Sequence, residues 1–109
     1  MTPPDFLFGA SVYPEIMTPE EWTALLDLCT RCRFTGVRLG ESAWGNLEPA
    51  PGRYEFGWLE RALEDLRARG LAAILGTNTY IAPVWLFEAH PDLAVQLDPG
   101  VAVHAMYRK

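Results

Sequence analysis

Short apolar runs alternate with helical patterns along this chain. The runs Phe8–Val12, Gly36–Gly40 and Leu71–Leu75 are too short for helices, and their nearly continuous apolar character is typical of strands covered on both faces. Between them, apolar residues recur at helical spacing from Trp22 to Cys32 and from Trp58 to Leu66. The pattern predicts the order strand, helix, strand, helix, strand.

Local signals set the expected helix ends. Thr18 followed three residues later by Glu21 has the form of a capping box, which predicts that the first helix begins there. The second helix is predicted over Trp58–Arg69, because Gly70 stands where a left-handed cap is favoured. A short third helix is expected around Val84–Ala89.

The remaining segments are predicted to be loops. A long polar and aromatic loop is expected over Glu41–Phe56 and a shorter one over Gly76–Pro83. Beyond Pro91 the pattern fades, and no regular element is predicted.

Strands and helices that alternate every 30 residues or so predict an α/β fold with a parallel sheet. A doubly wound sheet and a (β/α)₈ barrel both fit this order. The first strand is followed by Tyr13, Pro14 and Glu15 rather than by a glycine-rich phosphate loop, which disfavours a nucleotide-binding fold. In a barrel, the loops after the strands build the active site. The unusual residues lie at the carboxyl ends of the strands and in the loops that follow them: Tyr13, Glu15, Arg38, Glu41, Trp44, Thr77, Asn78 and Tyr80.

Composition and charge narrow the function classes. The 109 residues are 50% hydrophobic, which indicates a globular fold, and we treat residues 1–109 as one domain unit. Nine Lys and Arg are scattered among fourteen acids, so a nucleic-acid partner is not expected. The sequence contains no apolar run of about 18 residues, so no membrane-spanning helix is predicted. The N-terminus has no signal-peptide pattern, and a cytoplasmic location is expected.

The two cysteines stand as Cys29-x-x-Cys32. A zinc site needs about four ligands and no second pair is present, so we expect no metal. Both cysteines fall on the apolar stripe of the first helical pattern, where we expect them to act as small core residues.

Several motifs together resemble glycoside hydrolase family 42, the β-galactosidases. Gly9–Glu15 (GASVYPE) is similar to the motif of that family's first strand, and Arg38–Trp44 (RLGESAW) is similar to that of the second. Leu75–Thr79 (LGTNT), followed by Pro83–Leu86 (PVWL), resembles the third. The loop Leu47–Phe56 is less specific. The resemblance implies the first three β/α units of an incomplete (β/α)₈ (TIM) barrel.

The same resemblance implies a retaining hydrolase of terminal β-D-galactosides that needs no cofactor. Its acid/base and its nucleophile are two glutamates from the fourth and seventh strands, which this stretch does not include. Glu15, Glu41 and Glu48 are therefore not assigned to those roles, and the fragment alone is expected to be inactive. The expected partner is a carbohydrate. A homo-oligomer of the complete enzyme is compatible with the resemblance.

Candidate site residues follow from the resemblance and from side-chain chemistry. Arg38 is expected to support the nucleophilic carboxylate through paired hydrogen bonds. Glu41 either binds sugar hydroxyls or pairs with Arg38. Trp44 offers a flat face for a sugar ring, and Asn78 and Tyr13 offer hydrogen bonds to hydroxyls.

Arg108 is a further candidate, because Tyr107-Arg108-Lys109 aligns with a stretch in which the family carries a galactose-binding arginine. The residues Val101–Ala105 before it lack the family's basic cluster. Two other readings stay open at this point. One is a barrel glycosidase for a different sugar, and the other is a non-catalytic αβ interaction piece derived from the enzyme.

Overall fold

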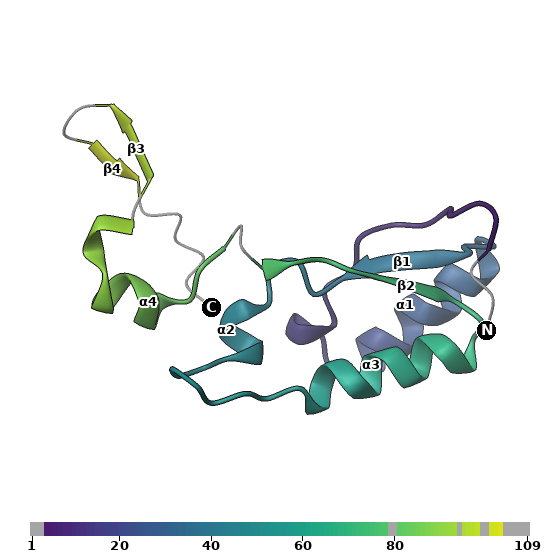
Figure 1. Ribbon diagram of the computed structural model, residues 1–109. Helices are drawn as coiled ribbons and strands as arrows, with labels where there is room; N and C mark the ends of the chain where they lie inside the picture. The colour runs from purple at the N-terminus through teal and green to yellow at the C-terminus, as the bar shows by residue number, and fades with distance from the viewer. Residues whose placement is uncertain (1–3, 79–80, 94, 99–100, 104–109) are drawn as a thin grey trace.

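The computed structural model describes residues 4–78, 81–93, 95–98 and 101–103. The elements in chain order are η1 (Pro14–Ile16), α1 (Pro19–Arg31), β1 (Gly36–Leu39), α2 (Trp44–Leu47), α3 (Gly57–Ala68), β2 (Ala72–Leu75), α4 (Val84–Ala89), η3 (Pro91–Leu93), β3 (Val95–Asp98) and β4 (Val101–Val103). Figure 1 shows β1 and β2 side by side, with α1 and α3 on one side of them.

The sheet is parallel, as the sequence predicts. β1 pairs with β2 in register from Gly36 opposite Ala72 to Leu39 opposite Leu75. The α/β class is therefore confirmed, and the second and third predicted strands form.

The first predicted strand forms only in part. Residues 8–12 run parallel to β1 and make a single bridge, between Ser11 and Arg38. The Val12 amide donates to the Arg38 carbonyl at 2.8 Å, and the Arg38 amide donates to the Ala10 carbonyl at 3.0 Å. A Cβ at Gly9 would collide with the carbonyl oxygen of Gly36, so only glycine permits this close approach. The spatial order is residues 8–12, then β1, then β2.

The local helix signals are confirmed. The Thr18 amide donates to Glu21 Oε2 at 2.9 Å and the Glu21 amide donates to Thr18 Oγ1 at 3.2 Å, which completes the capping box at the start of α1. Gly70 has φ +68° after α3, as expected for a left-handed cap. α3 begins and ends one residue before the predicted bounds, and α4 has the predicted bounds.

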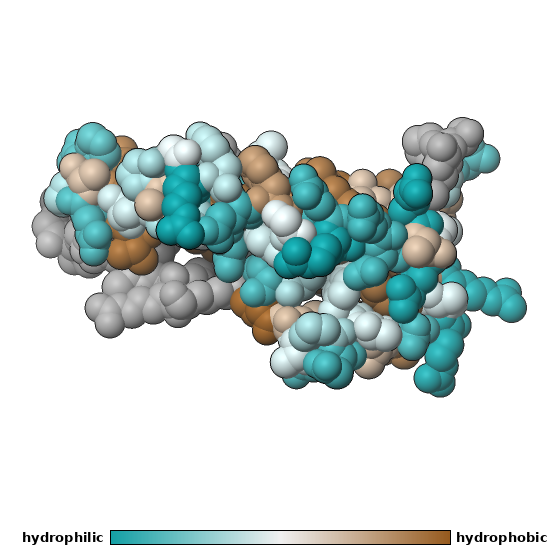
Figure 2. Space-filling model, turned by 90° about the horizontal axis from the view of Figure 1, so that it is seen from below, coloured by the Kyte–Doolittle hydropathy of each residue, from teal (hydrophilic) through white to brown (hydrophobic). Residues whose placement is uncertain are grey.

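The core lies between the sheet and the two long helices. It consists of Val12, Trp22, Leu26, Cys29, Val37, Leu39, Ala62, Leu66 and Leu71. Glu60, Arg61, Glu64 and Arg67 of α3 are exposed, and Figure 2, which views the molecule from below, shows hydrophilic side chains over much of that face. The stripes predicted for both helices thus meet the sheet.

Coverage of the strands differs from the prediction. We expected both faces to be covered, but Ile74 is 42% exposed and Leu75 is 54% exposed. The physical reason is that α1 and α3 cover one face only, and that β2 is the edge of the described parallel sheet (Figure 1).

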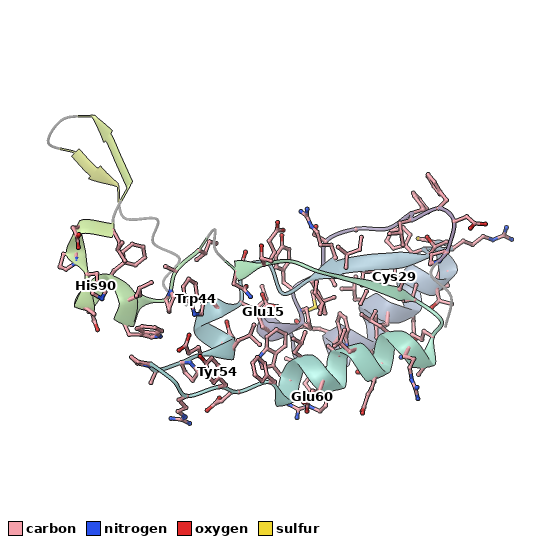
Figure 3. The ribbon with its side chains drawn as sticks, viewed as in Figure 1. Glu15, Cys29, Trp44, Tyr54, Glu60 and His90 are labelled. Carbon is pink, nitrogen blue, oxygen red and sulfur yellow. The ribbon has the colours of Figure 1, made fainter. Side chains whose placement is uncertain are left out.

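The expectation for the cysteines is half right. Cys29 is 2% exposed and lies between the sheet and the helices (Figure 3), whereas Cys32 is exposed. Cys32 is wrong as a core residue because α1 ends at Arg31 and the chain turns away there. Both thiols are free.

Regular segments also lie where none was predicted. α2 forms inside the long loop, and β3 pairs with β4 as an antiparallel hairpin beyond Pro91, so the assignment of that segment as irregular was wrong. The sequence Pro99-Gly100 between these strands is a pattern typical of turns and is the signal that could have found the hairpin. Of the helices that the structure describes, none is both long and apolar enough to cross a membrane.

Candidate active site

A cleft of about 860 Å³ opens where β1 ends. Its walls come from η1, from the turn after β1, from α2 and from α4 with the residues before it. The lining residues are Tyr13, Ile16, Arg38, Glu41, Ser42, Gly45, Asn46, Pro49, Ile81, Ala82, Pro83, Val84, Trp85 and Glu88. Three of the predicted site residues, Tyr13, Arg38 and Glu41, are therefore brought together.

Two of the lining residues, Arg38 and Glu41, form an ion pair. Arg38 Nη2 lies 3.0 Å from Glu41 Oε2, and Arg38 Nε donates to Ser11 Oγ at 3.1 Å. The side chains of Arg38 and Glu41 are 49% and 33% exposed. A guanidinium has five N–H donors, so Arg38 keeps donors for a second carboxylate or for a hydroxyl while it holds Glu41. Of the two roles left open for Glu41, pairing with Arg38 is the one seen in this chain.

The backbone beside this pair is packed closely. A Cβ at Gly76 would stand 2.8 Å from Glu41 Cβ, and the Gly76 amide donates to the Leu39 carbonyl at 3.0 Å. Only a residue without a side chain fits there, so Gly76 lets the turn that carries Glu41 lie against the end of β2. Gly76 was not among the predicted site residues.

Trp44 and Trp85 form an edge-to-face pair beside the cleft. Their ring centroids are 6.5 Å apart and the rings are perpendicular. Trp44 Nε1 donates to Glu48 Oε2 at 2.8 Å, and Trp85 Nε1 donates to the carbonyl oxygen of Glu48 at 2.9 Å. Trp85 lines the cleft, whereas the predicted Trp44 is not among the lining residues and lies on the side of α2 that faces α4 (Figure 3).

Glu48 is the centre of these contacts. Its other carboxylate oxygen, Oε1, accepts from the Gly52 amide at 2.8 Å. The hydrogen bond from Trp44, followed by that from the Gly52 amide, lowers the pKa of the Glu48 carboxyl below its ordinary value. The carboxyl is thus held ionised, and the turn after α2 is tied to both tryptophans.

The other predicted residues have different surroundings. Asn78 Oδ1 accepts from the Ala43 amide at 2.9 Å, which fixes the start of α2, and Asn78 does not line the cleft. Tyr13 is 38% exposed on the cleft wall. Arg108 lies outside the described residues.

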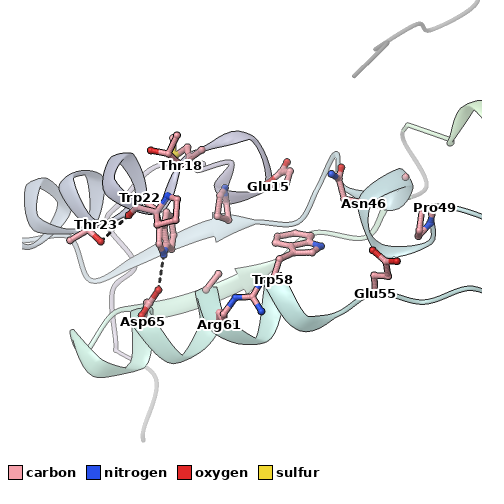
Figure 4. Close-up of a pocket in the computed structure, with 15 residues that line it drawn as sticks. Glu15, Thr18, Trp22, Thr23, Asn46, Pro49, Glu55, Trp58, Arg61 and Asp65 are labelled. Atoms are coloured by element: carbon pink, nitrogen blue, oxygen red, sulfur yellow. Dashed lines mark hydrogen bonds between the residues drawn. The ribbon is translucent and has the colours of Figure 1, made fainter.

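A second hollow, of about 600 Å³, lies on the helix side of the sheet (Figure 4). Trp22 and Trp58 line it together with Glu15, Arg61 and Asp65, and Trp22 Nε1 donates to Asp65 Oδ2 at 3.0 Å. Its lining does not include Arg38 or Glu41, so we take the cleft at the end of β1 as the candidate site. Within the part of the chain that the structure describes, no three His, Cys, Asp or Glu residues are grouped as metal ligands would be.

Comparison with known proteins gives one consistent result. The glycoside hydrolase family 42 model, described as beta-galactosidase, matches residues 11–109. The chain is 40% identical over 87 residues to a beta-galactosidase of Thermus thermophilus. This alignment covers 80% of this chain and 14% of the relative. It is 38% identical over 90 residues to beta-galactosidase BgaA of Clostridium cellulovorans, and that alignment covers 83% of this chain and 14% of the relative.

Solved structures agree. The beta-galactosidase of the psychrophilic Marinomonas ef1 has a TM-score of 0.80 at 32% identity, covering 89% of this chain and 15% of that one. The beta-galactosidase of the haloarchaeon Halorubrum lacusprofundi has a TM-score of 0.78 at 34% identity, covering 88% and 14%. The chain therefore spans a small part of the length of the relatives that it matches.

Proposed function

Because the chain belongs to glycoside hydrolase family 42, the beta-galactosidase family, we propose that it forms the first three β/α units of a (β/α)₈ barrel that hydrolyses terminal β-D-galactosides. The observation that carries this proposal is the placement of Arg38 and Glu41 in a cleft at the carboxyl end of a parallel strand. In barrel enzymes the active site is built at that end of the strands.

The proposed chemistry is a retaining double displacement. Two carboxyls about 5–5.5 Å apart act as acid/base and as nucleophile on opposite sides of the scissile bond. We assign both to glutamates of the fourth and seventh strands, outside these three units. Residues 1–109 alone should therefore not hydrolyse a β-galactoside.

The part that this chain plays is electrostatic. Arg38 projects from the end of β1 and holds Glu41 with one edge of its guanidinium. Its other donors stabilise the ionised form of the nucleophilic carboxylate, because a nearby positive charge favours deprotonation. Tyr13 on the same wall offers a hydroxyl to the sugar, and Arg108 contributes a further contact to galactose.

The proposal includes the setting of the enzyme. Hydrolysis by this route uses two carboxyls and water, so no cofactor takes part. The free thiols of Cys29 and Cys32 suit the reducing cytoplasm. The substrate is a β-galactoside, and the complete enzyme acts alone or as a homo-oligomer.

The test is a substrate panel with the full-length protein that carries this chain. We expect the highest kcat/KM for 4-nitrophenyl β-D-galactoside, compared with the corresponding β-glucoside, β-mannoside and β-xyloside. A preference for another sugar would replace galactoside specificity within the same fold. A folded protein inactive on every member of the panel would contradict the proposal and support a non-catalytic interaction piece.

A further inference from the structure

The candidate cleft has two chemically different sets of lining residues. Arg38 and Glu41 come from β1 and the turn after it, and they form an ion pair. α4 and the residues that lead into it line the same cleft, mostly with apolar side chains and with the one carboxylate of Glu88. The apolar lining residues there are Ile81, Ala82, Pro83, Val84 and Trp85. This division matches a substrate with a hydroxyl-rich part and a flat, less polar part.

Trp85 is the only aromatic residue that α4 contributes to the described lining of the cleft. It is partly buried, it lines the cleft, and the edge-to-face contact with Trp44 leaves its orientation fixed. The perpendicular contact with Trp44 at 6.5 Å and the hydrogen bond from Trp85 Nε1 both restrict the orientation of the ring. The ring of Trp85 is thus held in place at the cleft before a substrate binds.

Glu48 sets that orientation through two separate groups. Its carboxylate binds Trp44 Nε1 and the Gly52 amide, which fixes the turn after α2. Its carbonyl oxygen then accepts from Trp85 Nε1, which ties α4 to that turn across 37 residues of sequence. Because the hydrogen bonds from Trp44 and Gly52 lower the pKa of the carboxyl, both oxygens remain acceptors.

We propose that Trp85 forms the subsite for the leaving group of the substrate and that Glu48 is the positioning residue that holds Trp85 in place. The proposal rests on the proposed β-galactosidase function. It adds that the galactose ring lies beside Arg38 and that the leaving group lies against Trp85. The chemical class preferred there is a leaving group with a flat apolar face, such as an aryl ring or the less polar face of a second sugar.

The loss of Trp85 should affect aryl galactosides more than methyl galactosides. An aromatic contact of this kind is worth a factor of about two to ten in binding. An aryl galactoside can make it, whereas the single carbon of a methyl galactoside is too small. The loss of Trp85 should therefore lower the rate for the aryl substrate selectively.

The experiment uses the full-length protein and measures kcat/KM for 4-nitrophenyl and for methyl β-D-galactoside on the same preparation. The ratio of the two values does not depend on how much of the preparation is folded. We expect Trp85→Ala to lower this ratio about two- to tenfold, and inhibition by free galactose to remain at the wild-type level. Trp85→Phe should restore part of the ratio, since it keeps a flat ring but loses the N–H.

The role of Glu48 is tested in the same way. Glu48→Gln presents one oxygen and one NH₂ to two donors, so one hydrogen bond is lost and the ratio should fall in the same direction as for Trp85→Ala. Tyr54→Ala is the matched control, because Tyr54 is a 61% exposed aromatic residue that lines neither hollow, and its ratio should equal that of the wild type.

The outcomes separate the two proposals. Suppose the wild-type protein is active. If the ratio is then unchanged in Trp85→Ala, so that kcat/KM falls equally for both substrates or not at all, the leaving-group subsite is overturned and the proposed function stands. A normal ratio in Glu48→Gln together with a lowered ratio in Trp85→Ala would overturn the positioning role. Wild-type protein inactive on both galactosides would overturn the proposed function itself.

Discussion

Replacement of Arg38 by alanine should damage catalysis far more than stability. The Arg38–Glu41 pair is 3.0 Å long, but the two side chains are 49% and 33% exposed. Ion pairs this accessible contribute at most about 1 kcal/mol to the free energy of unfolding, because water screens them and two long side chains must be ordered. Arg38→Ala in the full-length protein should therefore stay folded, with a small change in its unfolding midpoint.

The expected kinetic loss is larger. If Arg38 supports the nucleophile, its interaction strengthens as the transition state forms, and removal of one such preorganised donor typically costs about a hundredfold in kcat. That factor corresponds to about 2.7 kcal/mol. We expect kcat to fall much more than KM rises. Arg38→Lys should recover only part of the loss, because an ammonium cannot make the paired planar contacts of a guanidinium.

The assay is steady-state kinetics with 4-nitrophenyl β-D-galactoside, with thermal unfolding of each variant alongside. Arg69→Ala is the matched control, since Arg69 forms a partly exposed ion pair with Asp27 at 3.3 Å on the helix side of the sheet. Its kcat should equal that of the wild type. A rise in KM with normal kcat in Arg38→Ala would refute the supporting role.

Three further predictions concern other parts of the chain. Arg108→Ala should weaken inhibition by galactose with nearly unchanged thermal stability; a large loss of stability with normal inhibition would make Arg108 structural. Leu26→Ala, at a fully buried position of α1, should cost about 2–5 kcal/mol in chemical unfolding, whereas Leu28→Ala, 49% exposed on the same helix, should cost roughly 0.5 or less. Equal costs would contradict the packing described for α1. In the folded protein a disulfide reagent should label Cys32 quickly and Cys29 only on unfolding, because burial, followed by the nearby Cys32, raises the pKa of the Cys29 thiol. Equal labelling rates would show that α1 does not pack as described.

Local signals allowed much of the fold to be predicted. The capping box of Thr18 and Glu21 and the glycine after α3 act within a few residues, so the sequence pattern carries them directly. Helical periodicity alone does not show where a helix ends, and this is why Cys32 was placed in the core. The stripe continues to Cys32 while α1 stops at Arg31.

In the candidate site too, contacts between residues close in sequence could be predicted, and contacts between distant residues could not. Arg38 and Glu41 are three residues apart, so their contact lies within the reach of sequence reasoning. Trp85 was missed because its place in the cleft depends on a hydrogen bond to Glu48, 37 residues away, and on the formation of α2. The start of α2 in turn depends on Asn78, 35 residues from Ala43. Such tertiary contacts leave no periodic trace in the sequence.

The most direct measurement is an exchange of segments. The part of the Thermus thermophilus beta-galactosidase that aligns with this chain, 87 residues at 40% identity, is replaced by the corresponding residues of this chain, and kcat/KM is measured for 4-nitrophenyl β-D-galactoside. If this chain supplies the Arg38 end of a β-galactosidase site, we expect the hybrid to hydrolyse the substrate and to lose about a hundredfold in kcat when Arg38→Ala is introduced. A folded hybrid that is inactive, or an active one that is indifferent to Arg38→Ala, would contradict that claim.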